Sequence, residues 1–338
     1  MFELELERPA SFPSRTVRGT AISGLGVAVP ESVVTNQEVA DRLGVTPEWI
    51  TERTGVKRRH VAGADRTLVD LATEAGKAAI ADANVEPAAI DLVIVATVTG
   101  EMLCPAAGPV VASNLGIEGA AAFDLNAACS GFLSGLSMAS SQIATGSSEL
   151  ALVIGVDLMY RVIDHYDKST AGIFADGGGA VVIAPSSAGG RVGRILLSSD
   201  GGRGALVEAT REEAIVRMNG HDTFRQAVRR LSESTLDALE AAEVGLDEID
   251  LFVYHQANSR IIAAVGEKLG LDPDRVVDCV GEYGNTSAGS IPIALGVARE
   301  DGRLKDGSRV LIGAFGGGLT WGAGVVEWGS GAGAHDQA

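Results

Sequence analysis

Two apolar runs with nearly the same surroundings stand far apart in the chain. One ends the segment VEPAAIDLVIV, residues 85–95, and the other ends VGLDEIDLFVY, residues 244–254. Asp91 and Asp250 occupy corresponding positions at an offset of 159 residues. Apolar runs without polar alternation are typical of strands buried on both faces of a sheet. Each run therefore predicts an inner strand, and the pair indicates an internal repeat.

Ala-rich segments with helical periodicity precede both strands, at residues 69–84 and 224–243. This alternation predicts an α/β fold with mainly parallel strand pairing. A second pair of strands supports the repeat, because GSSELALVIG ends at Gly155 and DGSRVLIG ends at Gly313, an offset of 158. We therefore expect two duplicated halves, residues 18–187 and 188–328, joined near PSSAGGR (185–191), although chance similarity of short apolar strands remains the alternative. Residues 1–17 are expected to form an extension and residues 329–338 a disordered tail.

Composition narrows the class of protein. Lys and Arg total 27 against 44 Asp and Glu, a net charge of −17, which is opposite to what a nucleic-acid-binding protein needs. Three cysteines cannot form a disulfide framework and indicate a reducing compartment. The N-terminal segment lacks the basic and apolar regions of a signal peptide, and the uncharged stretch 125–148 is too polar to span a bilayer. We expect a cytoplasmic globular protein.

Cys129 is the first candidate for chemistry. It stands in FDLNAACSGF, after a predicted strand at 120–125 and at the start of a predicted helix at 131–144. The positive field of a helix N-terminus favours the thiolate and lowers the thiol pKa below its usual value of about 8.5. Small neighbouring residues allow a sharp turn and close approach of a substrate. The alternative is a buried Cys that acts as a small apolar side chain.

Two further polar residues follow strands or Gly-rich turns. His255 comes directly after the second repeat strand, where α/β folds place functional groups, although it could be a structural histidine. Asn285 lies in GEYGNTSAGSIPIAL, a turn before a helix expected to begin near Ser287, and its alternative role is turn formation. The other four histidines lack metal-ligand spacing. The Gly-rich runs FADGGGAVVI and AFGGGLTWGAG match neither a P-loop nor a dinucleotide fingerprint.

Five motifs in order give the sequence a family resemblance. They are ERTGV (52–56), AACSGF around Cys129, HQAN from His255, YGNTSAGS around Asn285, and GGGLTWG near the C-terminus. Together they resemble the β-ketoacyl-ACP synthase III family of condensing enzymes, over about residues 21–328. The resemblance implies a thiolase-like five-layer αβαβα fold made of two duplicated halves, and a homodimer.

The resemblance also implies a mechanism. Cys129 accepts an acyl group from acyl-CoA, and the backbone N–H groups of Cys129 and Gly317 form the oxyanion hole. His255 and Asn285 then assist decarboxylative condensation with malonyl-ACP, which gives β-ketoacyl-ACP and CO₂, while Phe315 lines the decarboxylation site. Neither a metal nor a redox cofactor is expected.

Substrate contacts follow from the same resemblance. Trp49 and Arg161 match positions that flank the CoA adenine, Arg53 is placed for the nucleotide end, and Asn258 would touch the pantetheine arm or simply cap a helix. An acyl carrier protein is acidic, so a chain of charge −17 needs a local basic patch to receive it. The expected docking residues are Arg225, Arg260 and Lys268, with Arg229 and Arg230 nearby and Glu267 weakening the patch.

Three questions stay open in the sequence. Cys104 falls where some relatives place a bulky aromatic side chain that closes the acyl pocket across the dimer interface. We therefore expect the pocket to admit acyl groups larger than acetyl, unless Met102 or Leu103 fills the space.

The acceptor could be a hydroxyl or amine of a natural product instead of malonyl-ACP, with His255 as general base. A noncatalytic partner chain is the remaining alternative, and the intact Cys129, His255 and Asn285 argue against it.

Overall fold

The computed structural model describes residues 18–186 and 190–329. The predicted extension at 1–17 lies outside these ranges, as do residues 187–189 of the predicted link and all of the predicted tail except Gly329. The domain boundaries at these places therefore stay predictions.

The first five-stranded sheet has the order β1-β7-β6-β4-β5. Its strands are β1 (Gly19–Ala28), β4 (Leu92–Ala96), β5 (Ala121–Leu125), β6 (Ala151–Leu158) and β7 (Asp176–Ser186). Strand β4 runs parallel to β5 and β6, whereas β7 is antiparallel to both β1 and β6. Strand β5 forms one edge of this sheet, and the predicted repeat strand β4 lies next to it.

The second sheet has the order β12-β13-β14-β8, and β9 also pairs with β14. Its strands are β8 (Arg191–Val192), β9 (Leu196–Ser199), β12 (Leu251–Tyr254), β13 (Arg309–Gly316) and β14 (Thr320–Glu327). In this sheet only β12 and β13 pair in parallel. Antiparallel pairs outnumber parallel ones over the two sheets, so the expectation of mainly parallel pairing is wrong. The connection from β13 to β14 is three residues long, and so short a link permits only an antiparallel pair.

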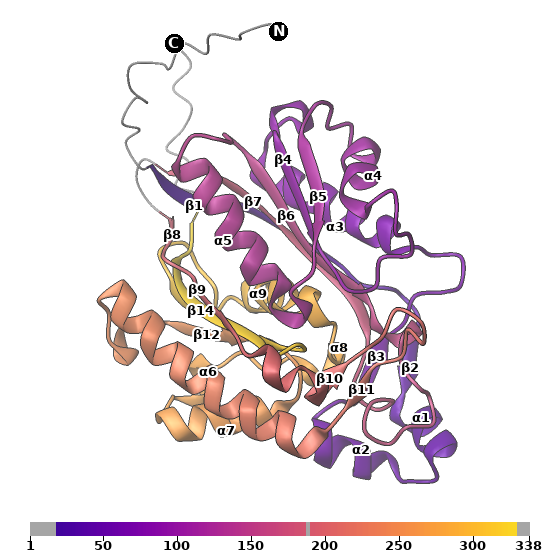
Figure 1. Cartoon of the computed structure of the whole chain (residues 1–338). Coiled ribbons are helices and arrows are strands. Elements are labelled where there is room, and N and C mark those ends of the chain that lie inside the picture. The colour runs from indigo at the N-terminus through magenta and orange to yellow at the C-terminus, as the bar shows by residue number, and fades with distance from the viewer. Residues whose placement is uncertain (1–17, 187–189, 330–338) are drawn as a thin grey trace, which may run out of the picture.

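Helices separate and cover the two sheets, which gives the five αβαβα layers of the predicted thiolase-like fold (Figure 1). Helices α5 (Gly131–Ala144) and α9 (Ser290–Glu300) lie between the sheets. Helices α3 (Leu68–Ala83) and α4 (Ala107–Asn114) pack on the outer face of the first sheet. Helices α6 (Gly220–Ala242) and α7 (Ser259–Leu269) pack on the outer face of the second.

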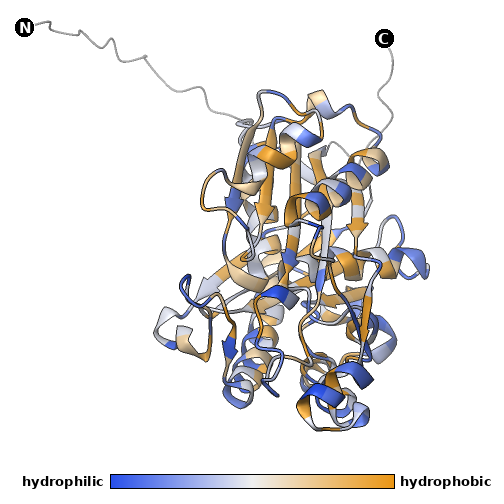
Figure 2. Cartoon of the chain, turned by 90° about the vertical axis from the view of Figure 1, so that its right-hand side faces the viewer, coloured by the Kyte–Doolittle hydropathy of each residue, from blue (hydrophilic) through white to orange (hydrophobic). Residues whose placement is uncertain are grey.

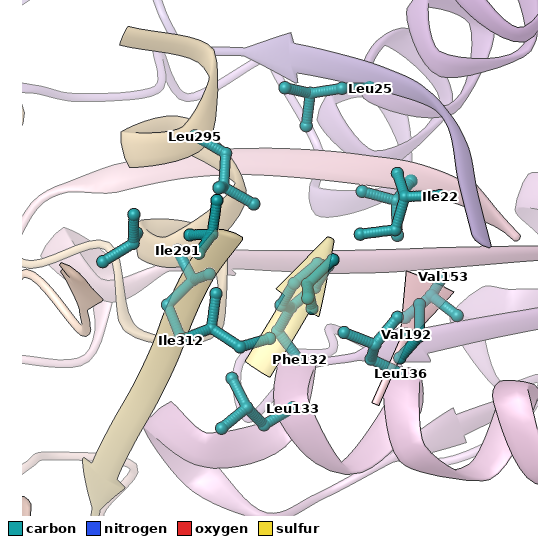
Figure 3. Close-up of a cluster of buried hydrophobic side chains, with 14 of the residues drawn as sticks. Ile22, Leu25, Phe132, Leu133, Leu136, Val153, Val192, Ile291, Leu295 and Ile312 are labelled. Carbon is teal, nitrogen blue, oxygen red and sulfur yellow. The ribbon is translucent and has the colours of Figure 1, made fainter. Parts of the chain in front are cut away.

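The central layer holds the main apolar core (Figure 3). Phe132 and Leu136 of α5 and Ile291 of α9 are buried together with Val153 of the first sheet and Ile312 of the second. Burying one such side chain stabilises a fold by about 1.5–3 kcal/mol. Helix α5 begins two residues after Cys129, and α9 begins five residues after Asn285. The core therefore fixes the two helices that directly follow these candidate residues.

The predicted helices form close to their expected bounds. The pattern at 69–84 becomes α3, where Thr67 caps the N-terminus and Asn84 takes a left-handed conformation at the C-terminus. The predicted helix at 131–144 has the bounds of α5. Helix α6 begins at Gly220, four residues before the apolar pattern, because the Asn219 side chain accepts the N–H of Asp222.

Smaller elements surround the ends of the sheets. The remaining strands and α-helices of the described residues are β2 (Val33–Thr35), α1 (Asn36–Leu43), α2 (Pro47–Thr54), β3 (Arg58–His60), β10 (Val207–Glu208), β11 (Arg217–Met218) and α8 (Val280–Tyr283). Figure 2 shows apolar positions concentrated on the strands and polar positions on the outer helices and loops. In the ranges described, no helix combines the length and the apolar character needed to cross a bilayer.

Candidate active site

Cys129 lies in a single 3-10 turn, η2 (Ala128–Ser130), that joins β5 to α5. The turn is tight, since Ala128 has a φ of 47°. Strand β13 approaches it so closely that a Cβ at Gly316 would lie 2.7 Å from the Cys129 nitrogen, so only glycine fits there. The Ser130 hydroxyl donates to Thr320 Oγ1 at 2.8 Å and ties the turn to β14. Both halves of the chain therefore hold this cysteine.

His255 follows the last residue of β12, as the sequence predicted. Its side chain is buried, and Nδ1 lies 2.6 Å from the Ser290 hydroxyl oxygen at the start of α9. Burial lowers the pKa of this imidazole to about 3. His255 is therefore a neutral ring at neutral pH and acts as a hydrogen-bond donor or acceptor without charge.

Asn285 is held by its own backbone against the first half of the chain. Its N–H donates to the Ile173 carbonyl and its carbonyl accepts the Ala175 N–H, each at 3.0 Å. Its side-chain Oδ1 accepts the backbone N–H of Ser287 at 2.9 Å. Since the amide oxygen is engaged in this way, the amide NH₂ is the group left to donate into the cavity.

These three residues line one cavity of about 550 Å³. Phe315, Gly316 and Gly317 at the end of β13 form part of the same wall. The backbone N–H groups of Gly317 and of Cys129 itself lower the pKa of the thiol. Backbone donors beside a nucleophilic sulfur can also stabilise the oxyanion of an acyl-transfer intermediate.

The protonation state of the thiol differs from the sequence-based expectation. Burial raises the pKa of Cys129 to about 11, with a smaller contribution from the negative charge of Asp157. The predicted helix N-terminus is present, but desolvation of the anion outweighs it. The resting residue is a thiol, and its proton must be removed before the sulfur can attack.

Comparison with known proteins agrees with this geometry. The family model for the 3-oxoacyl-[acyl-carrier-protein] synthase III C-terminal part matches residues 239–328, and the model described as 3-oxoacyl-[acyl-carrier-protein] synthase III matches residues 123–201. A beta-ketoacyl-[acyl-carrier-protein] synthase III of Streptomyces coelicolor is 43% identical over 94% of this chain and 97% of the relative. A Bradyrhizobium diazoefficiens relative of the same description is 42% identical over 91% of this chain and 98% of its own. The chain belongs to the β-ketoacyl-ACP synthase III family.

Solved structures of family members have the same fold. A synthase III from Aquifex aeolicus superposes with a TM-score of 0.90 at 40% identity, over 92% of this chain and all of the other. The priming β-ketosynthase of the R1128 polyketide pathway superposes with a TM-score of 0.89 at 32% identity, over 96% and 99% of the two chains. The likeness therefore covers nearly the whole synthase III chain.

Three of the predicted substrate residues lie at the cavity mouth of this synthase III family member. Trp49, Arg53 and Asn258 all line the cavity, and the Arg53 guanidinium lies 4.2 Å from the centre of a Trp49 ring. Asn258 forms the helix cap that was one of the two roles considered for it, and its contact with the pantetheine arm stays a prediction. It caps α7 by accepting the Arg260 N–H at 2.9 Å, and its Nδ2 donates to the Arg53 carbonyl at 3.0 Å. Helix α2 is thereby fixed beside α7.

Arg161 lies outside the lining of this cavity, and its assignment to the CoA adenine stays a prediction. Its guanidinium donates to the carbonyls of Gly63 and Arg66 and pairs with Glu101 at 3.4 Å, and it does not line the cavity. Lys168, seven residues later, lines the cavity together with Trp49. Sequence reasoning missed Lys168 because it stands in an irregular polar loop, where no periodicity links it to the site. Sequence reasoning also missed Ser169 in the same loop, and His221 and Phe224 at the start of α6, all of which line the cavity.

The remaining predicted residues lie on the surface. Cys104 is exposed and does not line the cavity of its own chain. Arg225 and Lys268 are exposed on α6 and α7, and Arg260 is exposed at the cavity mouth, 5.7 Å from the Phe224 ring. In the described ranges, no three His, Cys, Asp or Glu side chains are grouped so as to hold a metal ion.

Proposed function

We propose that this synthase III family member transfers an acyl group from acyl-CoA to Cys129 and then condenses it with malonyl-ACP. The products would be β-ketoacyl-ACP, CO₂ and free CoA. The observation that carries the proposal is the meeting of Cys129, His255 and Asn285 on one cavity. The sequence identity with β-ketoacyl-ACP synthase III enzymes along most of the chain supports it.

In the first step, the Cys129 sulfur attacks the thioester carbonyl and CoA leaves as its thiolate. Negative charge develops on the carbonyl oxygen during the attack. The N–H groups of Cys129 and Gly317 are placed to receive that charge, and one such donor typically contributes about 3 kcal/mol to catalysis. The product is an acyl-Cys129 thioester.

In the second step, malonyl-ACP binds with its thioester carbonyl toward His255 and Asn285. The carbon–carbon bond to the carboxylate breaks, CO₂ leaves, and the electron pair passes into an enolate. Neutral His255 and the Asn285 NH₂ donate hydrogen bonds to the enolate oxygen. The enolate carbon then attacks acyl-Cys129 and expels its thiolate, while Phe315 walls the site.

Cationic side chains at and near the mouth of the cavity would recognise CoA and the acyl carrier protein. Trp49, Arg53 and Lys168 would take the nucleotide end of CoA, through ring stacking and cationic contacts with phosphate. Arg225, Arg260 and Lys268 would receive the acidic carrier protein. Arg229 and Arg230 contribute less, since both pair with Glu233.

The proposal includes a homodimer with a wide acyl pocket. Strand β5 is a partly exposed sheet edge, and the nearby chain exposes Met102 and Leu103 at 63% and 85%. A second copy paired along β5 would cover this edge and bring its Cys104 segment toward the acyl pocket. The small Cys104 side chain favours acyl groups larger than acetyl. The likeness to a polyketide priming β-ketosynthase supports a role in natural-product initiation.

The test is product formation from defined substrates. The protein is incubated with a series of acyl-CoAs, from acetyl to branched and longer chains, together with malonyl-ACP, and β-ketoacyl-ACP and CO₂ are quantified. We expect equal amounts of both products, a preference for acyl groups beyond acetyl, and loss of condensation in C129A, H255A and N285A. CO₂ release without a β-ketoacyl product, or transfer only to alcohols and amines, would contradict the proposal.

A further inference from the structure

A threonine hydroxyl lies between the two turns that carry the backbone donors of the candidate site. Cys129 belongs to the turn η2, which follows β5 of the first sheet. Gly317 belongs to the three-residue turn between β13 and β14 of the second sheet. Thr320 is the first residue of β14. The two reaction steps proposed for Cys129 do not involve the Thr320 hydroxyl group.

The hydrogen bonds of this hydroxyl reach both turns. Thr320 Oγ1 lies 2.9 Å from the Ala127 carbonyl oxygen and 3.3 Å from the Gly317 carbonyl oxygen. It also accepts the Ser130 hydroxyl at 2.8 Å. Ala127 and Ser130 stand on either side of Cys129 in the chain. One hydroxyl group can donate and accept at the same time, so Thr320 spans the space between the two turns.

Backbone hydrogen bonds do not hold the two turns together. In the ranges 18–186 and 190–329, no hydrogen bond between backbone groups joins residues 126–131 to residues 313–320. Their backbones are nevertheless in close contact, because a Cβ at Gly316 would lie 2.7 Å from the Cys129 nitrogen. Close packing prevents the turns from approaching further but does not prevent them from separating. The hydrogen bonds of Thr320 resist that separation.

An oxyanion hole is sensitive to the spacing of its donors. The N–H groups of Cys129 and Gly317 must both lie about 2.7–3.1 Å from one oxygen atom. They belong to turns of different sheets, so local backbone geometry does not set the distance between them. A displacement of about 1 Å near a reacting centre can slow a reaction about 100-fold. A contact that fixes this distance therefore affects the rate of acylation.

We propose that Thr320 is a positioning residue that sets the spacing between the Cys129 and Gly317 N–H groups. Its hydroxyl holds the Ala127 carbonyl of one turn from the first position of the strand that follows the other. Thr320 acts on the reacting atoms through these turns. The inference rests on the proposed function for the two N–H donors only, and recognition of CoA or malonyl-ACP plays no part in it.

The hydrogen bonds give Thr320 and Ser130 unequal roles. Ser130 Oγ lies 2.8 Å from the Ala127 carbonyl oxygen and 2.8 Å from Thr320 Oγ1. Without the Thr320 hydroxyl, Ser130 can still donate to Ala127 in its own turn, but the link between the turns is lost. Without the Ser130 hydroxyl, Thr320 still donates to Ala127 and the link remains. Thr320 should therefore matter more for acylation, although Ser130 is the more buried residue.

Ser134 provides a matched control on α5. It is partly buried, like Thr320, and its hydroxyl donates to the Ser130 carbonyl at 3.1 Å. In the described part of the chain, no hydrogen bond links the Ser134 side chain to a residue of the second sheet. Loss of this hydroxyl removes a hydrogen bond close to the site without changing the contact between the two turns.

The test compares two reactions of the Cys129 sulfur that use the same thiolate. Attack on p-nitrophenyl acetate forms a sulfur–carbon bond and a tetrahedral oxyanion, and p-nitrophenolate then leaves with the electron pair. Alkylation by iodoacetamide expels iodide and forms no oxyanion. Both rates are measured at pH 7.5 by intact mass, with peptide mapping to separate Cys129 from the exposed Cys104. The proteins are the full chain and its variants T320V, T320S, S130A and S134A.

The ratio of the acylation rate to the alkylation rate isolates the oxyanion. Valine keeps the shape of Thr320 and suits a strand, so T320V removes the hydroxyl with little change in packing. We expect the ratio to fall at least tenfold in T320V. It should stay within threefold of the parent in T320S, which restores the hydroxyl, and in S130A, and within twofold in S134A.

Three outcomes would overturn the inference. One is a T320V ratio within threefold of the parent. A second is an equal fall of acylation and alkylation in T320V, which would assign Thr320 a purely structural role. The third is a fall in S130A as large as that in T320V, because the loss would then follow the burial of the hydroxyl and not the link between the turns.

The parent protein separates this inference from the proposed function. If p-nitrophenyl acetate acylates Cys129 but no acyl-CoA does, the result contradicts the proposed function alone. If Cys129 of the parent is alkylated normally but resists acylation by the ester, the two N–H groups form no working oxyanion hole, and the role of Thr320 is refuted.

Discussion

The hydroxyl oxygen of Ser290 lies 2.6 Å from Nδ1 of His255. The same oxygen accepts the Gln256 N–H at 3.3 Å, so the Ser290 hydrogen is available for Nδ1. With that hydrogen on the Ser290 oxygen, the ring proton of neutral His255 resides on Nε2. This is the tautomer that can donate a hydrogen bond to a thioester carbonyl.

Ser290→Ala should therefore weaken the condensation step more than the loading step. Loss of the hydroxyl allows the His255 ring to change tautomer. We therefore expect the rate of malonyl-CoA decarboxylation to fall about tenfold, which corresponds to an increase of about 1.4 kcal/mol in the activation free energy. Acyl loading of Cys129, followed by mass, should fall less than threefold. An equal loss in both steps would show that Ser290 supports the fold of the site and not the state of the ring.

The pKa values predict different pH profiles for the two steps. His255 has a pKa of about 3, below the usual value near 6.5, so malonyl-CoA decarboxylation by C129A should be flat from pH 5 to pH 8. Because the unfolded chain binds a proton in the range where folded His255 does not, this residue also costs stability as the pH falls from 6.5 toward 3. A bell-shaped profile centred near pH 6.5 would contradict the assignment.

Arg225 and Arg229 form a matched pair on one face of α6. No hydrogen bond or ion pair of Arg225 occurs in the described part of the chain, whereas Arg229 pairs with Glu233 at 2.8 Å. Arg225→Glu should raise KM for malonyl-ACP about tenfold and leave the reaction with malonyl-CoA unchanged, because only the carrier protein is bound there. Arg229→Glu should change KM less than threefold. The same KM effect in both variants would remove Arg225 from the docking site.

Lys168 and Arg161 are alternative cations for the nucleotide end of CoA. Lys168→Ala should raise KM for acyl-CoA about three- to tenfold, since it removes a cation from the cavity beside Trp49. Arg161→Ala should leave KM unchanged and lower Tm by a few degrees, because Arg161 donates to the carbonyls of Gly63 and Arg66. A KM effect confined to Arg161→Ala would assign the nucleotide contact to Arg161 and not to Lys168.

The sequence identified the cysteine, histidine and asparagine because each stands in a short motif at the end of a strand or turn. The same motifs could not disclose the raised pKa of the Cys129 thiol, since burial by β13 and by the turn η7 (Ser287–Gly289) depends on residues more than 150 positions away. Helical periodicity located α3 and α5 to within one residue. It could not locate α6 as closely, because Asn219 caps that helix ahead of its apolar stripe.

Other features had no local pattern to reveal them. Lys168 lies in an irregular loop, and Ser287 belongs to a turn whose left-handed backbone is visible only in the fold. Asp157 looks like an ordinary polar residue at the end of an apolar strand. Its contacts with Thr97 and Thr99 arise from the parallel pairing of β4 and β6. The antiparallel β13–β14 hairpin was missed because the Gly-rich run AFGGGLTWGAG was not interpreted as a turn between two strands.

The proposed condensation requires that Cys129 carry the acyl group that malonyl-ACP consumes. The most direct measurement loads the protein with a preferred acyl-CoA, removes free CoA, and follows the intact mass while malonyl-ACP is added. We expect one acyl mass per chain, located on Cys129, that disappears as β-ketoacyl-ACP and CO₂ form in equal amounts. A stable acyl-Cys129 that ignores malonyl-ACP, or no acylation by any thioester, would contradict it.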